Sequence, residues 1–245
     1  MNECVSSFYP LSSVFCLSIL PAPSSPPRGV VGSPRSNSSI ILHWQPPEKL
    51  HWNGPLLGYQ MSHKPAGYPD NTLKFENVTD PSKLFAEIGH LEPFQEYDVA
   101  IAAFNAKGIG VFSAYTRVRT QEGRPVAPPI DVEAVPLNST SLRISWTSPP
   151  QRQINGINQG YKVIVTSEGD ATEVVHVVMS NTSNMVGRQS GHVSGLRKFT
   201  KYLISVLCFT SKGDGPRSRL IKTQTLEDGE WLLDVFTGCS MAVSL

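Results

Sequence analysis

The side chains that could perform chemistry in this chain show no spacing typical of a catalytic or metal site. The six histidines lack an H-x-x-x-H spacing and any pairing with cysteine that would suit zinc; they are His43, His51, His63, His90, His176 and His192. The sequence contains neither a G-x-S-x-G nucleophile motif nor a G-x-x-x-x-G-K-[ST] phosphate loop. We therefore expect a protein that is not an enzyme and that needs no metal or other cofactor.

The tripeptide Lys212-Gly213-Asp214 is a candidate contact loop. It places a cation and a carboxylate on a predicted turn and is similar to an integrin-recognition tripeptide. Gly-Asp-Gly is also a good tight turn in its own right, and Gly108–Gly110 occupies the matching turn without the carboxylate. Both interpretations, a recognition loop and a simple turn, stay open at the level of the sequence.

Basic residues are concentrated in the second half of the chain. Residues 128–226 contain eleven lysines and arginines against six acidic residues, although the whole chain has a net charge of only +1. Six of them form a candidate basic patch: Arg197, Lys198, Lys201, Arg217, Arg219 and Lys222. Such a patch could attract heparan sulfate or anionic lipid headgroups, or could be a solvated face that prevents edge-strand aggregation. The near-neutral total charge argues against binding to nucleic acid.

Four N-x-[ST] sequons suggest passage through the secretory pathway. They begin at Asn37, Asn77, Asn138 and Asn181, all at predicted turns or strand edges where a glycan could face water. The alternative is that the sequons are unused in a cytosolic protein. Of the four cysteines only Cys208 falls within a predicted domain, so no disulfide framework is expected; its parity with neighbouring apolar residues predicts an inward-pointing small hydrophobe.

The chain contains an internal repeat, because one strand-and-turn segment occurs twice. This repeat is the framework that positions the residues named above. Leu91–Ser113 recurs as Leu196–Ser218, and Trp44 recurs as Trp146. Four core markers, Trp44, Tyr97, Trp146 and Tyr202, anchor the two copies, and each Tyr is placed to lock a corner of a β-sandwich. Alternating apolar residues and frequent turn residues predict an all-β fold of two tandem, seven-stranded, antiparallel β-sandwiches.

The repeat predicts the following domain organisation. Residues 26–121 form the first domain, residues 122–127 a short linker, and residues 128–226 the second domain. Residues 1–25 are expected to be an N-terminal extension, either a weak signal segment or a disordered or alternative start; their ten-residue apolar run is too short to span a bilayer. Residues 227–245 are expected to be a non-domain tail, too short and polar for a transmembrane helix, on a truncated product.

The pattern resembles the fibronectin type III family. The resemblance rests on the opening Pro-Pro, the paired tryptophans, the Gly-Tyr pairs, the Leu-to-Tyr corner and the Gly-x-Gly turn before Ser113 and Ser218. More narrowly, INGINQGYKVIV and VSGLRKFTKYLISVLCFTSKGDGPRS are similar to repeats of the sidekick family of immunoglobulin and fibronectin type III adhesion proteins. That resemblance implies an extracellular spacer or contact surface in neuronal, synaptic cell–cell adhesion. Its partners would be other cell-surface proteins, including members of the same family.

Two rival functions use the same fold. A cytokine-receptor ectodomain would have paired cysteines in its first domain and a Trp-Ser-x-Trp-Ser element near the end of its second. Residues 26–121 contain no cysteine, and the tail of the second domain reads Pro216-Arg217-Ser218-Arg219. An intracellular scaffold of the muscle type is the other alternative, because the sequons alone do not exclude it.

Overall fold

The computed structural model describes residues 21–169, 172–179 and 187–228, and these residues are almost entirely β-strand. The helical elements among them are α1 (Gln151–Ile154) and two single 3-10 turns (Lys49–His51 and Asp70–Thr72). The proposed N-terminal extension lies outside the described residues up to position 20, and the proposed tail does so from position 229. The predicted all-β class is confirmed.

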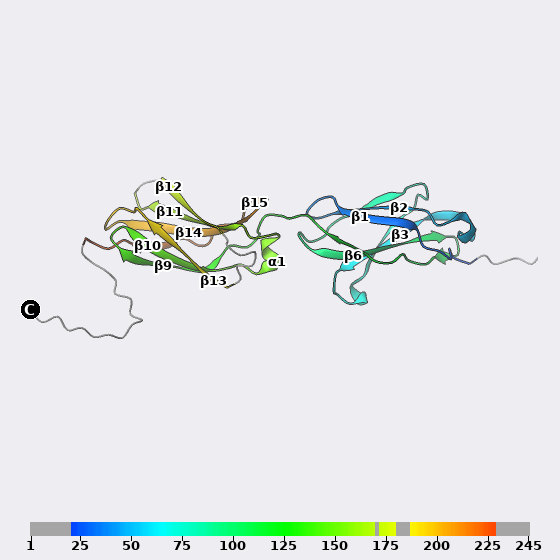
Figure 1. Cartoon of the computed structure of the whole chain (residues 1–245), viewed down its shortest axis with the longest axis horizontal. Coiled ribbons are helices and arrows are strands. Elements are labelled where there is room, and N and C mark those ends of the chain that lie inside the picture. Colours follow the sequence, from blue (N-terminus) through cyan, green and yellow to red (C-terminus); the bar gives the residue numbers. More distant parts are fainter. Residues whose placement is uncertain (1–20, 170–171, 180–186, 229–245) are drawn as a thin grey trace, which may run out of the picture. The chain divides into compact units, whose positions relative to one another are not determined.

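The first repeat consists of two antiparallel sheets, drawn blue to green in Figure 1. Its strands are β1 (Arg28–Pro34), β2 (Ile40–Gln45), β3 (Leu56–Pro65), β4 (Lys74–Val78), β5 (Phe85–Ile88), β6 (Glu96–Asn105), β7 (Gly108–Ile109) and β8 (Thr116–Arg119). One sheet has the order β1-β2-β5. The other has the order β4-β3-β6-β7, with β8 also pairing with β6.

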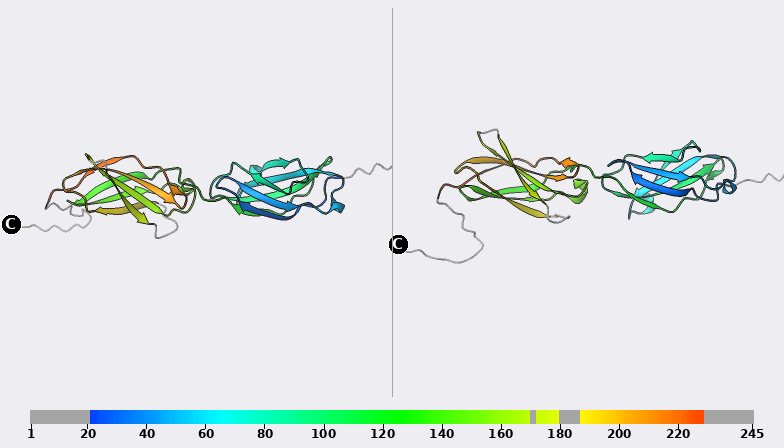
Figure 2. Two further views of the ribbon diagram at one scale, coloured as in Figure 1. Left: turned by 90° about the horizontal axis from the view of Figure 1, so that it is seen from above. Right: turned by 45° about the horizontal axis from the view of Figure 1, so that its top comes forward.

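The second repeat has the same topology, and its two sheets can be followed in Figures 1 and 2. Its strands are β9 (Ile130–Asn138), β10 (Ser141–Thr147), β11 (Gly160–Ser167), β12 (Glu173–Met179), β13 (Arg188–Ser194), β14 (Lys201–Thr210), β15 (Gly213–Asp214) and β16 (Ile221–Gln224). The sheets have the orders β13-β10-β9 and β12-β11-β14-β15, and β16 pairs with β14.

The predicted count of seven strands per repeat is not confirmed, because the described residues form eight in each. The additional strands are the two-residue β7 and β15, which lie within the Gly-x-Gly turns themselves. Between β7 and β8, the Ser113 backbone N–H donates to the Ile101 carbonyl oxygen, while the Ser113 hydroxyl oxygen accepts from the Ile101 N–H. Ser218 makes the same pair of bonds with Val206. A side-chain oxygen thus replaces a backbone acceptor, which explains why both copies of the motif end in serine.

Each repeat closes its core by packing a tryptophan of one sheet against a tyrosine of the other. Trp44 on β2 and Tyr59 on β3 have ring centroids 5.1 Å apart, and Trp146 on β10 and Tyr161 on β11 have the same separation. In β10 the alternate residues Leu142, Ile144 and Trp146 are fully buried, as their period of two predicted. Edge-to-face and tilted aromatic pairs at this distance stabilise a core beyond their burial alone.

The two repeated tyrosines, Tyr97 and Tyr202, lock the corners before β6 and β14. The Glu92 backbone N–H donates to the Tyr97 hydroxyl oxygen at 2.9 Å, and the Arg197 N–H donates to the Tyr202 hydroxyl at 2.8 Å. Both rings are buried. The predicted corner role is therefore present in the geometry of both repeats.

Removing one of these hydroxyls should destabilise its own repeat. In Tyr202→Phe, the Arg197 N–H loses its acceptor, and we expect the free energy of unfolding of the second repeat to fall by about 1–3 kcal/mol. Denaturant unfolding followed by circular dichroism measures the change. Tyr115→Phe is the control, since the Tyr115 side chain is half exposed in the first repeat. Equal stability of Tyr202→Phe and the unmodified chain would contradict the corner role.

Both corners also contain a phenylalanine in the left-handed region of backbone space. Phe94 has φ 54° and Phe199 has φ 43°, values that are strained for a bulky side chain. Phe94 is half-buried, and the Arg119 guanidinium lies 5.0 Å above its ring. Phe199 is 61% exposed, so little apolar burial offsets its strain.

Glycine should therefore be better than phenylalanine at position 199. We expect Phe199→Gly to raise the free energy of unfolding of the second repeat by about 0.5–1 kcal/mol, because glycine adopts positive φ without a steric penalty. Thermal unfolding by calorimetry gives the readout. The neighbouring Thr200→Gly, at a position without positive φ, should instead be destabilising. A loss of stability in Phe199→Gly would show that the ring contributes more than its exposure indicates.

Candidate contact surfaces

The candidate loop Lys212-Gly213-Asp214 does not present a free carboxylate. Gly213 and Asp214 form β15, which pairs with the end of β14. Both carboxylate oxygens of Asp214 accept from the Lys162 ammonium, at 2.8 and 2.9 Å, and that ammonium lies 5.3 Å from the centroid of the Phe209 ring. The geometry supports the simple-turn interpretation, while recognition through this loop stays an untested prediction.

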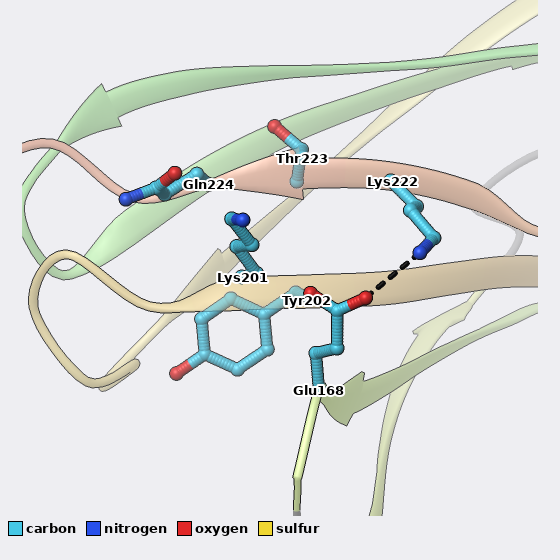
Figure 3. Close-up of a pocket in the computed structure, with 6 residues that line it drawn as sticks. All are labelled: Glu168, Lys201, Tyr202, Lys222, Thr223 and Gln224. Carbon is cyan, nitrogen blue, oxygen red and sulfur yellow. Dashed lines mark hydrogen bonds and ion pairs between the residues drawn. The ribbon is translucent and has the colours of Figure 1, made fainter.

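The six residues of the candidate basic patch occur in the loop before β14, on β14, before β16 and on β16, and several have acidic partners. Arg217 makes two hydrogen bonds to the Glu173 carboxylate, at 2.7 and 3.0 Å. Lys222 pairs with Glu168 at 2.7 Å. Figure 3 shows this second pair in a shallow pocket that is also lined by Lys201, Tyr202, Thr223 and Gln224.

Lys198 is a third cation of the patch with an acidic partner, since its ammonium lies 2.5 Å from the Asp228 carboxylate. Hydrogen bonding to these cations lowers the pKa of Glu168, Glu173 and Asp228. Lowered pKa values in the folded state mean that the pairs are kept at neutral pH and are lost only as the pH falls through those values. Because carboxylates pair with Lys198, Arg217 and Lys222, the predicted attraction for heparan sulfate or anionic lipid is reduced; it remains a prediction.

Three of the four sequons lie among the described residues, at positions that differ in accessibility. Asn37 is exposed in the turn between β1 and β2, and Asn77 is exposed on the edge strand β4. Asn138 ends β9 and is half-buried, with its side-chain oxygen accepting bonds from Thr140 and Ser141. Asn181 lies outside the described residues. Asn77 is thus placed to carry a glycan over the outward face of the first repeat's larger sheet.

The one cysteine among the described residues behaves as a core residue. The Cys208 side chain is fully buried, and desolvation raises the pKa of its thiol to about 11. Such a thiol is inert at neutral pH. Within the described ranges we find no group of three or more side chains arranged to bind a metal ion, and no helix there is long and apolar enough to cross a membrane.

A surface that the sequence did not single out lies on β12, the edge strand of the second repeat's larger sheet. Its outward-facing residues Val175, Val177 and Met179 are 48%, 52% and 57% exposed. Only the sheet order shows that this strand is an edge. We call these three residues the β12 strip.

The β12 strip can be compared with its counterpart in the first repeat, because the register of the two sheets matches. Val177 lies opposite Lys162 on β11, and Asn77 lies opposite Gln60 on β3, where the Gln60 amide donates to the Asn77 side-chain oxygen at 3.0 Å. The two strand ends read Asn77-Val78-Thr79 and Val177-Val178-Met179. The first repeat therefore has a sequon where the second exposes Val177 and Met179, while both repeats expose an apolar residue at the preceding outward position, Phe75 and Val175.

A comparison with models of known protein families identifies the fold of both repeats. The model of the fibronectin type III domain matches residues 25–119 and 127–224. The chain belongs to the fibronectin type III family. The two matched segments cover both pairs of sheets, and the features that carried the resemblance are the tryptophans, tyrosine corners and turns described above.

The comparisons also confirm the narrower resemblance to sidekick proteins. The chain is 41% identical over 214 residues to Protein sidekick of Drosophila melanogaster and 42% identical over 206 residues to Protein sidekick-1 of Homo sapiens. Each match covers 84% of this chain but only 10% and 9% of those proteins, so the chain spans about a tenth of their length. Among solved structures, the FN1–FN3 domains of chicken CNTN1 are 26% identical with a TM-score of 0.40, covering 84% of this chain and 66% of that one.

Proposed function

We propose that this chain is a non-catalytic, extracellular contact module of a cell-adhesion protein. The first repeat would serve mainly as a spacer, and the second would contact other cell-surface proteins. The similarity to sidekick proteins supports an adhesion role of the kind found in that family, between neurons. The sequons at exposed positions support passage through the secretory pathway.

The observation that carries this proposal is the difference between the two repeats at matched positions. Val177 and Met179 are exposed on β12 where the first repeat has Asn77 and Thr79 of its sequon, while the position that matches Val175 is occupied by the exposed Phe75. Exposed apolar side chains gathered on one element mark interaction sites more often than chance. A glycan at the position of Asn77 would keep the first repeat free of such contacts.

The proposal is tested by transferring the sequon from the first repeat to the second. In the double variant Val177→Asn with Met179→Thr, the end of β12 takes the Asn-Val-Thr sequence found at residues 77–79. When the full chain is displayed on cultured cells, we expect adhesion to neighbouring cells to fall at least tenfold, and a glycosidase-sensitive mass shift to report the added glycan.

A matched control places a glycan on the opposite sheet of the same repeat. Arg143→Asn creates the sequence N-I-S on β10, with the exposed position 143 facing away from the core. Adhesion should be unchanged in this variant. Equal adhesion of the two glycan variants would contradict the assignment of the contact surface, and a chain that stays in the cytosol without glycans would favour an intracellular scaffold.

A further inference from the structure

The free edge of β12 is able to pair with another strand. Among the residues that the structure describes, β12 pairs with β11 alone and so forms one edge of its sheet. Its register against β11 is continuous from Glu173 to Met179, and the strand contains no proline, lysine or bulge; its one acidic residue, Glu173 at the first position, is paired with Arg217. Natural sheets usually protect an edge with one of these features. The equivalent edge strand β4 has Lys74, Glu76 and the sequon at Asn77.

The hydrogen-bond pattern shows which backbone groups of β12 point outward. The Glu168 N–H donates to the Lys201 carbonyl oxygen at 2.9 Å, at the end of the β11–β14 pairing. Hydrogen-bonded residues alternate along an antiparallel pair, so the even-numbered residues of β11 bond to β14 and the odd-numbered ones bond to β12.

The odd-numbered residues of β11 lie opposite the even-numbered residues of β12. Consequently Val174, His176 and Val178 use their backbone groups within the sheet. The N–H and C=O groups of Val175 and Val177 point away from β11 to the free edge. These are the same residues whose side chains form the exposed β12 strip.

The sequence of β12 is nearly symmetric about its central residue. It reads Glu-Val-Val-His-Val-Val-Met, with His176 at the centre. When two copies pair antiparallel about a two-fold axis at His176, Val175 lies opposite Val177 of the second copy. Both residues point their backbone N–H and C=O groups to the free edge, so Val175 and Val177 of the second copy form a hydrogen-bonded pair. Glu173 then lies opposite Met179, so no two carboxylates face each other.

We propose that β12 pairs with β12 of a second copy of this chain, joining the two larger sheets into one continuous sheet. This names a partner for the contact surface and so rests on the proposed function, although its test is separate. Pairing places the valines of the β12 strips next to one another on the shared outer face. Two seven-residue strands bury less area than a standard stable interface, so we expect a dissociation constant between about 10 µM and about 1 mM. Such a weak contact becomes effective when chains are concentrated on a surface.

Sedimentation of the 245-residue chain under reducing conditions tests the pairing, over concentrations from about 5 µM to about 1 mM. The expected result is a concentration-dependent dimer. Val175→Pro should raise the dissociation constant at least tenfold, because it removes a donor that points to the free edge while the bonds to β11 remain. Val177→Lys should have the same effect through charge, whereas Asn77→Lys on β4 should leave association unchanged. A monomer at every concentration would overturn the proposal.

The two-fold register is tested by cysteine cross-linking. In a chain with Cys4, Cys16 and Cys239 changed to serine, His176→Cys places each new thiol opposite its own copy. Residues in such a non-hydrogen-bonded pair have Cα atoms about 4.5 Å apart, within reach of a disulfide. Oxidation should give a covalent dimer with His176→Cys and little with Val174→Cys. Equal cross-linking of the two variants would overturn this register.

Dimerisation without adhesion would contradict only the proposed function, and adhesion by a monomeric chain would contradict only the pairing.

Discussion

Replacing Trp146 with alanine is expected to destabilise the second repeat by about 3–5 kcal/mol. The indole is fully buried and packs against the Tyr161 ring across the two sheets. It also lies directly on the backbone of β13, because a Cβ built at Gly191 would be only 3.2 Å from the indole ring. No neighbouring side chain can fill a space of this size without moving a strand. Since whole domains are stable by only about 5–15 kcal/mol, this loss is a large fraction of the stability of the second repeat, and its unfolding transition should shift to a clearly lower temperature.

Calorimetry of the full chain is the appropriate measurement, because the substitution also removes a fluorescent probe. The contacts of Trp146 described above lie within the second repeat, so the transition of the first repeat should be unchanged. Leu220→Ala is the control: its side chain is 65% exposed, and the expected change is within about 0.5 kcal/mol. A loss of less than about 1 kcal/mol in Trp146→Ala would mean that the core closes without its largest side chain.

The fold was predictable from the sequence because each repeat contains residues that fit only one local environment. Trp146, Tyr202 and Asn155 each require one particular environment: a deep core, a corner acceptor and a left-handed turn. Asn53 and Asn155 are each followed by glycine, and both have positive φ, a conformation that asparagine tolerates in turns. Because these requirements recur at a nearly constant spacing, the sequence indicated two copies of one sandwich before any pairing was known.

The contact surface could not be predicted in the same way, because it depends on which strands are neighbours. The apolar residues of β12 are typical of any half-buried strand, and only the sheet order shows that Val175 and Val177 face water at an edge. The basic patch, by contrast, was evident in the sequence but is partly neutralised in the folded chain. Arg217 and Lys222 appeared as surplus charge in the sequence, but folding brings Glu173 and Glu168 to them from more than forty residues away. Long-range pairing thus exposed one surface and neutralised part of another.

Gly58→Ala should be the most damaging single-methyl change in the first repeat, with an expected loss of about 2–4 kcal/mol in its free energy of unfolding. Gly58 precedes Tyr59 in one of the two Gly-Tyr pairs. A Cβ at this position would overlap the Val78 carbonyl oxygen of β4 and lie 2.9 Å from the Phe104 ring. The carbonyl belongs to the backbone, so relief requires β4 to separate from β3 near the register pair Tyr59 and Val78.

Gly89→Ala provides the matched control for this prediction within the same repeat. A Cβ at Gly89 would meet no atom within 4 Å, and its φ does not lie in the left-handed region. Its stability should therefore equal or slightly exceed that of the unmodified chain, since alanine restricts the unfolded state more than glycine does. Hydrogen exchange would locate the damage in Gly58→Ala, with faster exchange expected first in β4. Unchanged stability of Gly58→Ala would show that β3 and β4 can part locally at little energetic cost, and the Gly-Tyr pair would then need another explanation than the close approach of β4.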